Sequence, residues 1–184
     1  MKRVQREEIL PLAEYEKVRP QFRARVMALK NERRIHVGEY LTFLFEHHDT
    51  VLYQVQEMMR AERMQGDAEI RHELETYNEL LGGRGELGCT LLIEIEDAAT
   101  RDQLLAKWTD LPSKIWLETQ AGKRVPAEFD PRQVGDRRAS SVQYLKFHVG
   151  DGVPVRMGCD HTELKIAVEL EPIQVGALVR DLVG

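Results

Sequence analysis

The sequence IHVGEYLTFLFEHHDTVLYQVQEMMRAERM, residues 35–64, contains the local signals that decide the fold. Two strand-like runs, 33–37 and 40–46, lie on either side of Gly38-Glu39, and the second is rich in aliphatic and aromatic residues. Residues of these types favour extended backbone, and a short glycine-containing turn between two such runs is typical of a β-hairpin. The stretch therefore predicts two antiparallel strands at its start.

A helix is predicted directly after this hairpin. Asp49 or Thr50 can cap a helix that begins near residue 51, because a short side-chain oxygen accepts hydrogen bonds from the free N–H groups of the first turn. At helical spacing, one face carries Val51, Leu52, Val55, Met58 and Met59. Glu62 falls on the same face, and burying an unpaired carboxylate is costly. We therefore predict that Glu62 is substantially buried and bonded to a basic or hydroxyl side chain.

A second helix, at about residues 68–81, has two contrasting faces. The apolar face carries Ile70, Leu74, Tyr77 and Leu81. The Glu69-x-x-His72 spacing on the polar side is the one that ferritin-like di-iron proteins use, but those proteins need two such pairs and this chain has one. A solvated polar face is the default interpretation, and no cofactor is predicted. The alternative is a non-haem metal bound by Glu62, His72, Glu75 and Glu79.

The composition is that of a globular protein in a reducing compartment. Hydrophobic residues make up 42% and charged residues 31% of the 184 residues, and the apolar runs are too short for a membrane span. No secretory segment follows the first basic residues. Cys89 and Cys159 have neither a disulfide-framework nor a metal-knuckle spacing. These features predict a cytoplasmic protein with no membrane association.

The net charge of −5 is unevenly distributed. Residues 1–34 contain ten Lys/Arg and five Asp/Glu, a balance of +5, whereas the remainder contains sixteen and twenty-six, a balance of −10. A helix predicted over residues 13–31, with a kink or restart at Pro20, has an apolar stripe of Val18, Phe22, Val26 and Leu29. Beside the stripe lies a basic ridge of Arg19, Arg23 and Lys30.

An exposed helix face is the default interpretation of this ridge. The alternatives are contact with the chain's own acidic remainder, or docking to an acidic partner or a second copy of this chain. Nucleic acid is not expected, because the protein is acidic overall and no recognised nucleic-acid module is present.

Residues 81–85, Leu-Gly-Gly-Arg-Gly, separate a helical and hairpin part, 1–81, from a sheet-rich part, 86–184. The glycines lack the spacing and the lysine of a phosphate-binding loop. After them, strands are predicted at 87–96, 115–119, 124–129, 142–149 and 164–170, with a helix capped by Asp97 and a closing helix from Pro172. We predict a single α+β domain, 1–184, with a mostly antiparallel sheet and the N-terminal helices packed on it.

The sequence offers little catalytic chemistry. No Gly-x-Ser-x-Gly elbow is present. Cys159-Asp160-His161 places a thiol near an imidazole, but a nucleophile and its base need hydrogen-bond reach, which spacing does not establish, and an inert thiol is the default. His47-His48 would bind metal only with distant ligands, and a solvent-exposed loop pair is the default interpretation.

Several long segments resemble an uncharacterised bacterial family of unknown function. They include ILPLAEYEKVRP, RRIHVGEYLTFLFE, DTVLYQVQEMMRAER, HELETYNELL, EFDPRQ and SSVQYLKF. Members of that family are typically encoded beside a rubrerythrin-like protein and an iron–sulfur protein similar to heterodisulfide reductase subunits. The resemblance therefore implies redox or peroxide-handling partners, and it carries no established activity.

The residues that match the family's pattern supply the candidate ligand-binding set: Glu57, Arg60, Glu62, Tyr77 and Asn78. Two functions follow as expectations. The first is a cytoplasmic accessory or interaction protein that serves an iron–sulfur or rubrerythrin-type redox system, with that partner or a second copy of this chain bound to it. The second is an enzyme that binds a metal or a small ligand through a Glu/His cluster. The incomplete ligand set favours the first.

Overall fold

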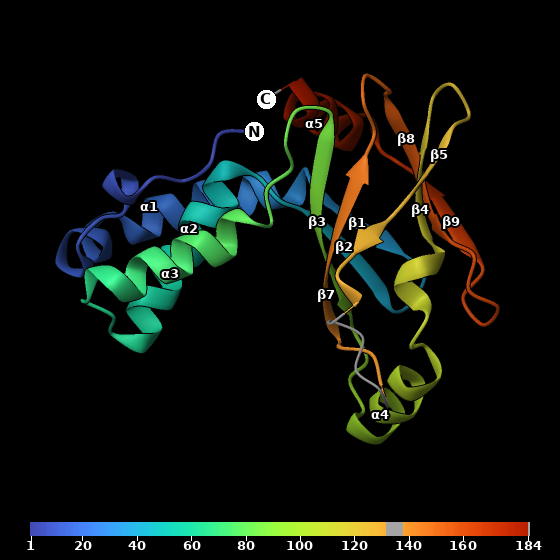
Figure 1. The fold of residues 1–184 in the computed structure, drawn as a ribbon, viewed down its shortest axis with the longest axis horizontal. Helices are drawn as coiled ribbons and strands as arrows, with labels where there is room; N and C mark the ends of the chain where they lie inside the picture. The colour runs from blue at the N-terminus through green and yellow to red at the C-terminus, as the bar shows by residue number, and fades with distance from the viewer. Residues whose placement is uncertain (132–137, 184) are drawn as a thin grey trace.

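A computed structural model describes residues 1–131 and 138–183 of the chain. Two antiparallel sheets face each other, three helices lie beside the first sheet, and the C-terminal helix packs at one end of both sheets (Figure 1). This arrangement confirms the predicted α+β class. Among the helices of the described residues, none combines the length and the apolar character needed to cross a membrane.

The first sheet has five strands in the order β1-β2-β3-β7-β6, each antiparallel to its neighbour. They are β1 (Arg34–Val37), β2 (Leu41–Phe45), β3 (Glu86–Ile93), β7 (Val142–His148) and β6 (Glu128–Phe129). The β1–β2 connection turns at Gly38, whose φ of 69° favours glycine. The predicted hairpin is confirmed.

The second sheet has four strands in the order β5-β4-β8-β9. They are β5 (Arg124–Pro126), β4 (Ile115–Thr119), β8 (Pro154–Cys159) and β9 (Ile166–Glu169). Alternate residues of each strand point toward the other sheet, so the main hydrophobic core lies between the two sheets. Its largest fully buried side chains include Trp108, Phe43, Phe45 and Phe147.

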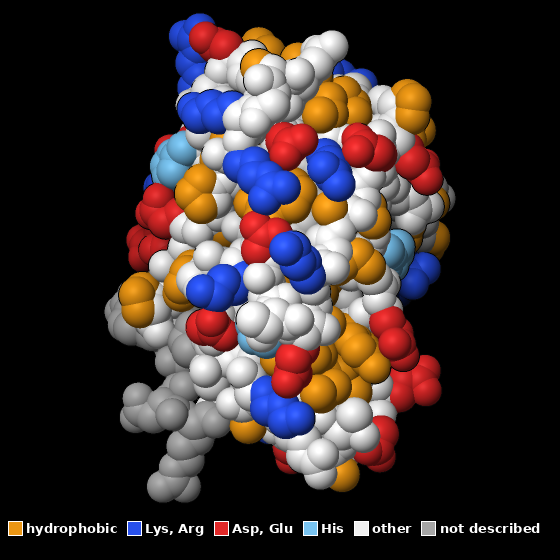
Figure 2. Space-filling model, turned by 90° about the vertical axis from the view of Figure 1, so that its right-hand side faces the viewer, with side chains coloured by type: hydrophobic (Ala, Val, Ile, Leu, Met, Phe, Trp, Pro, Cys, Tyr) orange, Lys and Arg blue, Asp and Glu red, His pale blue; other side chains and the backbone are white. Residues whose placement is uncertain are grey.

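The outer face of the second sheet carries charges of both signs (Figure 2). Arg124 contacts Glu118 at 3.1 Å, and Arg156 contacts Glu169 at 3.3 Å. The Arg124 guanidinium also lies 3.8 Å from the centroid of the Trp116 ring. Because these arginines are paired within the chain, this face has little unbalanced charge for a partner.

The N-terminal elements pack chiefly on each other. They are η1 (Arg6–Glu8), α1 (Leu12–Asn31), α2 (His48–Glu62) and α3 (Asp67–Asn78). They enclose a second apolar cluster of Val4, Ile9, Val51, Val55, Met59, Ile70, Leu74 and Leu81. This cluster is separate from the core between the sheets, to which β1 and β2 contribute, so the N-terminal helices have a small core of their own. The prediction of a single domain stays a prediction.

The two remaining α-helices pack against the sheets. Asp97 caps α4 (Ala98–Lys107) by accepting a hydrogen bond of 2.8 Å from the Thr100 N–H, as predicted. The closing helix, α5 (Pro172–Val183), begins at the predicted proline. A fully buried ion pair connects α5 to the start of the first sheet: Arg33 donates to both carboxylate oxygens of Asp181, at 2.7 and 2.9 Å.

Three predicted helix features are wrong. The cap of α2 is His47, whose ring nitrogen accepts from the Asp49 N–H, so the helix begins three residues before Val51. Helix α1 continues through Pro20, so the predicted restart there does not occur, whereas the predicted kink stays a prediction. Val18 lies 43% exposed outside its buried face, because the buried position one turn earlier belongs to Tyr15.

Two strand features also differ from the prediction. The run 124–129 divides between the sheets, with β5 in the second and β6 in the first. Strand β8 was not predicted, because its sequence PVRMGC contains Arg156 and Gly158 and lacks a clear apolar alternation. A methyl group at Gly158 would overlap the Trp116 ring on the neighbouring strand, so this position requires glycine for packing. Most of the predicted loop 130–139 lies outside the described residues.

Candidate functional site

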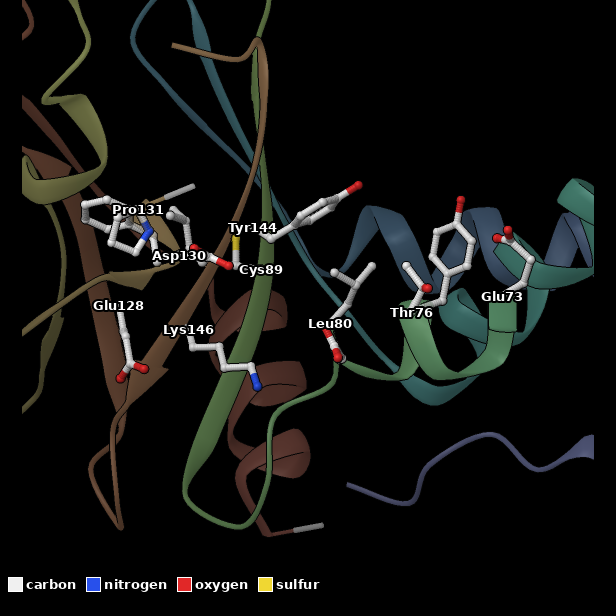
Figure 3. Close-up of a pocket in the computed structure, with 13 residues that line it drawn as sticks. Glu73, Thr76, Leu80, Cys89, Glu128, Asp130, Pro131, Tyr144 and Lys146 are labelled. Atoms are coloured by element: carbon white, nitrogen blue, oxygen red, sulfur yellow. The ribbon is translucent and has the colours of Figure 1, made fainter. Parts of the chain in front are cut away.

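A large cleft lies between α3 and the outer face of the first sheet (Figure 3). Its volume is about 790 Å³, within the range of ligand sites in proteins. The residues that line it come from two sides. Helix α3 and the residues directly after it contribute Glu73, Thr76, Tyr77, Glu79 and Leu80. The first sheet and the segment after β6 contribute Cys89, Glu128, Phe129, Asp130, Pro131, Tyr144, Leu145 and Lys146.

Strand and helix periodicity place these side chains in the cleft. In β7 the even-numbered residues Tyr144 and Lys146 point outward, toward α3, while Leu145 points into the core between the sheets (Figure 3). On α3, Leu74 is buried in the helical core, so the neighbouring residue Glu73 lies on a side of the helix that faces the cleft. The cleft is therefore the space between two separately packed layers.

The cleft is acidic and aromatic. Among the described residues, four carboxylic side chains line it, Glu73, Glu79, Glu128 and Asp130, against one lysine. The tyrosines, Tyr77 and Tyr144, come from opposite walls. Carboxylates and electron-rich ring faces both attract a cation. The lining is therefore suited to a positively charged group.

A histidine ties the rim of this cleft to the sheet. His148 on β7 contacts Glu86 on β3 at 3.0 Å and Glu128 on β6 at 2.6 Å. Glu86 also accepts the Gly83 N–H, and this hydrogen bond lowers the pKa of Glu86. The short edge strand β6 is thus held by a side-chain contact as well as by its backbone pairing.

A smaller chamber of about 260 Å³ adjoins the cleft and shares Tyr77, Leu80 and Tyr144 with it. Glu46 lies in its wall, 9% exposed. One carboxylate oxygen accepts from the Thr90 hydroxyl and the other from the Thr50 hydroxyl, each at 2.6 Å. These two threonines come from β3 and from the first turn of α2, so the carboxylate is held between a sheet and a helix.

Lys30 lies in the wall of the same chamber. Its ammonium is 5.8 Å from the centroid of the Tyr53 ring, and its burial lowers the pKa of Lys30. Lys30 is therefore not part of an exposed basic ridge.

The other two ridge residues are also separated from each other. Arg19 donates to both oxygens of Glu57, at 2.8 Å each, and Tyr15 donates its hydroxyl to Glu57 at 2.6 Å. The hydrogen bond from Arg19 lowers the pKa of Glu57 to about 2, and burial, with the nearby Glu57, raises the pKa of Tyr15. Of the three ridge residues only Arg23 is exposed. The alternative in which the ridge meets the chain's own acidic residues is confirmed for Arg19.

Most of the sequence-predicted site residues lie outside the cleft. Glu57 is paired as described. Arg60 contacts Glu16 at 2.6 Å on the surface. Asn78 is buried and binds the backbone of Val4 through its oxygen at 2.8 Å and its nitrogen at 2.9 Å. Of the predicted ligand-binding set only Tyr77 lines the cleft.

The predicted burial of Glu62 is wrong. Glu62 is the last residue of α2, and it is exposed. The chain reverses at Arg63, which has a left-handed φ of 53°, so the apolar face ends with Met59, before the helix does. His72 and Glu75 on α3 are exposed as well, and Glu79 lies at the cleft. In the part of the chain that the structure describes, no three His, Cys, Asp or Glu side chains are grouped to hold a metal.

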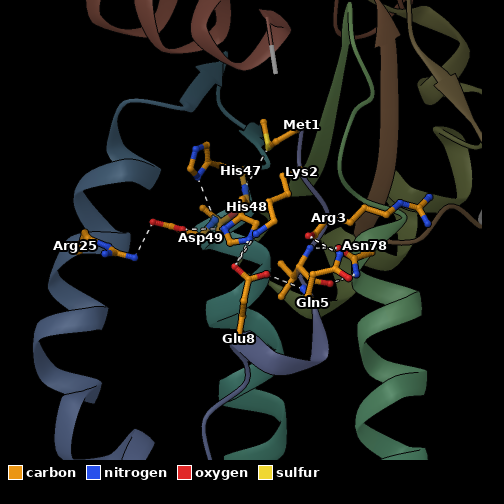
Figure 4. Close-up of polar contacts among 12 residues, drawn as sticks. Met1, Lys2, Arg3, Gln5, Glu8, Arg25, His47, His48, Asp49 and Asn78 are labelled. Carbon is orange, nitrogen blue, oxygen red and sulfur yellow. Dashed lines mark hydrogen bonds and ion pairs between the residues drawn. The ribbon is translucent and has the colours of Figure 1, made fainter.

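The N-terminal segment covers the start of α2 (Figure 4). His48 contacts Glu8 of η1 at 3.1 Å and Asp49 at 3.0 Å, and Arg25 of α1 contacts Asp49 at 2.8 Å. His47 and His48 are half-buried, so their interpretation as a solvent-exposed loop pair is wrong. Their contacts connect helices, and both rings have structural partners.

The cysteines are held as thiols. Cys89 and Cys159 are free and buried, and burial raises the pKa of each thiol. The imidazole of His161 accepts the Glu163 N–H at 3.2 Å and contacts Asp110 at 3.3 Å, while Cys159 accepts only the His161 backbone N–H. His161 is thus engaged away from the sulfur, in agreement with an inert cysteine.

A family model described as "Protein of unknown function (DUF3501)" matches residues 3–182. The chain belongs to this family. The chain is also similar to a solved structure described as a novel protein of unknown function from Burkholderia pseudomallei K96243, determined by crystallography at 1.90 Å. Its TM-score is 0.91 and its identity 30%, over 98% of this chain and 100% of that chain. No curated protein matches the sequence. The DUF3501 family is thus identified for nearly the whole chain, and it brings no activity with it.

Sequence reasoning missed most of the cleft. Glu73, Thr76, Leu80, Tyr144 and Lys146 were not among its candidates. The outward alternation of Tyr144 and Lys146 on a predicted strand was a usable signal. That α3 faces this strand could not be predicted, because the two segments are about 70 residues apart in sequence and meet only through tertiary packing.

Proposed function

We propose that this chain is an accessory protein that binds a basic segment of a partner protein in the cleft between α3 and the first sheet. The observation that carries the proposal is the lining of the cleft: among the residues that the structure describes, four carboxylic side chains surround two tyrosine rings, with Lys146 as the one basic group. Charge complementarity steers association and sets its register. A segment bearing Lys or Arg side chains meets both the carboxylates and the ring faces.

The state of the thiols supports binding over chemistry. Both cysteines are buried, and their raised pKa values keep them protonated, whereas the thiolate is the form that attacks substrates and ligates metals. An accessory role leaves the redox chemistry to other proteins. The partner proposed here is the iron–sulfur or rubrerythrin-type protein implied by the family resemblance, in the cytoplasm.

Two double variants with equal charge changes test the cleft. Glu73→Gln with Glu79→Gln removes two charges from its lining, whereas Glu62→Gln with Glu75→Gln removes two exposed charges outside it. We expect the first pair to raise the Kd for the purified partner about tenfold at low salt, equivalent to about 1.4 kcal/mol. The control pair should leave the Kd within about twofold, which is about 0.4 kcal/mol.

Isothermal titration calorimetry at two ionic strengths provides the measurement, because screened charges should lose their effect at high salt. Equal weakening by both variant pairs would show a general charge effect and contradict the cleft as the docking site. Self-association that responds to the same variants would identify the occupant as a second copy of this chain and overturn the redox partner.

The metal-binding alternative remains a prediction for Glu62, His72, Glu75 and Glu79. Elemental analysis of protein purified without a histidine tag tests it. About one equivalent of iron, zinc or manganese that disappears in His72→Ala would favour the metal-binding enzyme over the accessory role.

A further inference from the structure

The chamber beside Glu46 contains one acidic and one basic side chain that do not pair with each other. Glu46 and Lys30 both line it, and no ion pair within 4.0 Å joins these two described residues. Burying an ionised group without a counter-charge is unfavourable. The chamber is thus a small site in which an acidic and a basic side chain can each still bind a charged group of a ligand.

The Glu46 carboxylate is held in a fixed orientation. The Thr50 and Thr90 hydroxyls each donate to one of its oxygens, and the Glu46 N–H donates to the carbonyl of Gly88 at 2.9 Å. A carboxylate has about four lone-pair positions, so two positions remain for another donor. Such a pre-oriented acceptor lowers the cost of ordering when an ammonium group binds.

Lys30 lines the same chamber. Its stem is half-buried at the C-terminal end of α1, and the Tyr53 ring lies beside its nitrogen. The ring faces the cation but accepts no strong hydrogen bond, so the three N–H donors of the ammonium remain suited to an anionic oxygen.

The rest of the wall is mostly apolar. Its aliphatic and aromatic members are Leu44, Val51, Leu80, Leu92, Val142, Tyr77 and Tyr144. Val142 and Tyr144 are 40% and 42% exposed, an amount of uncovered apolar surface that a ligand would remove from water. A simple amine would be repelled by Lys30, and a simple carboxylate by Glu46.

We infer that the chamber binds a small zwitterion, an α-amino acid with an apolar side chain, whose ammonium meets Glu46 and whose carboxylate meets Lys30. The apolar side chain lies against the Leu92, Val142 and Tyr144 wall. This inference goes beyond the docking of a protein partner and does not depend on it, because neither charged group of the chamber lines the outer cleft.

Analogues that lack one charge test the inference by calorimetry. L-leucine, L-methionine and L-phenylalanine serve as amino acids, N-acetyl-L-leucine lacks the ammonium, and L-leucinamide lacks the carboxylate. At least one of the three amino acids should bind at millimolar or lower concentration. L-leucine should bind at least about tenfold more tightly than either of its analogues, a difference of about 1.4 kcal/mol.

Two variants test whether Glu46 binds the ammonium group of the amino acid and Lys30 its carboxylate. In Glu46→Gln the preference for L-leucine over N-acetyl-L-leucine should disappear, since glutamine keeps an oxygen acceptor for a threonine hydroxyl but loses the charge. In Lys30→Met the preference for L-leucine over L-leucinamide should disappear. If Glu46→Gln does not fold, Lys30→Met is sufficient to test the site. Glu14→Gln, an exposed change on α1, should bind like the wild type.

Absence of binding by all three amino acids to the folded wild type overturns the inference. Binding to both chamber variants with unchanged preferences overturns it as well. The Glu73 and Glu79 variants measure partner docking separately, so the failure of one proposal is distinguishable from the failure of the other.

Discussion

Glu57 is a carboxylate whose charge stabilises the helical layer. It accepts from Arg19 and from the fully buried Tyr15, and its pKa is lowered from 4.5 to about 2. A carboxyl group whose pKa is lower in the folded state stabilises the fold above its unfolded pKa and loses that contribution as the pH falls through its folded pKa.

We therefore expect Glu57→Gln to lower the free energy of unfolding by about 1–2 kcal/mol at pH 7, allowing for solvent screening of this partly exposed pair. The deficit relative to the wild type should shrink as the pH falls from 4.5 toward 2. Urea unfolding at several pH values measures it, with the exposed Glu62→Gln as control. A deficit that is constant across this range would show that the Glu57 charge is not responsible.

For single residues, the sequence predicts which side chains share a helix face better than it predicts which other elements contact them. The apolar face of α2 was predicted correctly for Val51, Val55 and Met59, because helical spacing alone determines it. Glu62 continues that spacing, but it is the exposed last residue of α2, and no local pattern records where the buried part of a helix face ends. Glu46 was passed over for the same reason, since its two threonine partners come from different elements.

Among the elements, α3 is joined to the N-terminal segment through Asn78. Its side chain makes a donor and an acceptor hydrogen bond with the backbone of Val4. We expect Asn78→Ala to destabilise the protein by about 2 kcal/mol, because it leaves a buried N–H and a buried carbonyl without partners.

Hydrogen exchange should locate this effect. Amides of residues 1–10 should exchange faster in Asn78→Ala than in the wild type, while β3 and β7 keep their protection. Glu75→Ala, on the exposed side of α3, is the control. Unchanged protection of residues 1–10 in Asn78→Ala would mean that apolar contacts of Val4 and Ile9 hold the segment without the amide.

Element prediction succeeded where the signals were local. The β1–β2 hairpin, the Asp97 cap and the closing helix at Pro172 all depend on adjacent residues. Element prediction failed where contacts between distant segments determine the structure. Strand β8 contains Gly158, which weakens the strand pattern in sequence but accommodates the Trp116 ring in the fold.

For the molecule as a whole, the Arg33–Asp181 pair joins residues 148 positions apart. Both side chains are fully buried, so removing one leaves the other as an uncompensated charge. We expect Arg33→Met to cost about 3–5 kcal/mol in unfolding free energy, and the double variant Arg33→Met with Asp181→Leu to cost much less.

Denaturant unfolding of the two single variants and the double variant forms a complete cycle. Additive losses in that cycle would contradict the pairing as the source of stability, since coupled residues show a large interaction energy. The uneven distribution of charge along the chain does not indicate this pair. Net charge counts groups, whereas Arg33, Arg19 and Arg6 are neutralised inside the chain by Asp181, Glu57 and Asp67.

The division of residues 124–129 between the two sheets has a mechanical consequence. Strand β5 is fixed in the second sheet and β6 forms the lip of the cleft, and Ala127 between them donates its N–H to the carbonyl of Ile115. The backbone of Ala127 therefore connects the lip of the cleft directly to the second sheet. A displacement of β6 would therefore pull on the hydrogen bond between Ala127 and Ile115, at the start of β4.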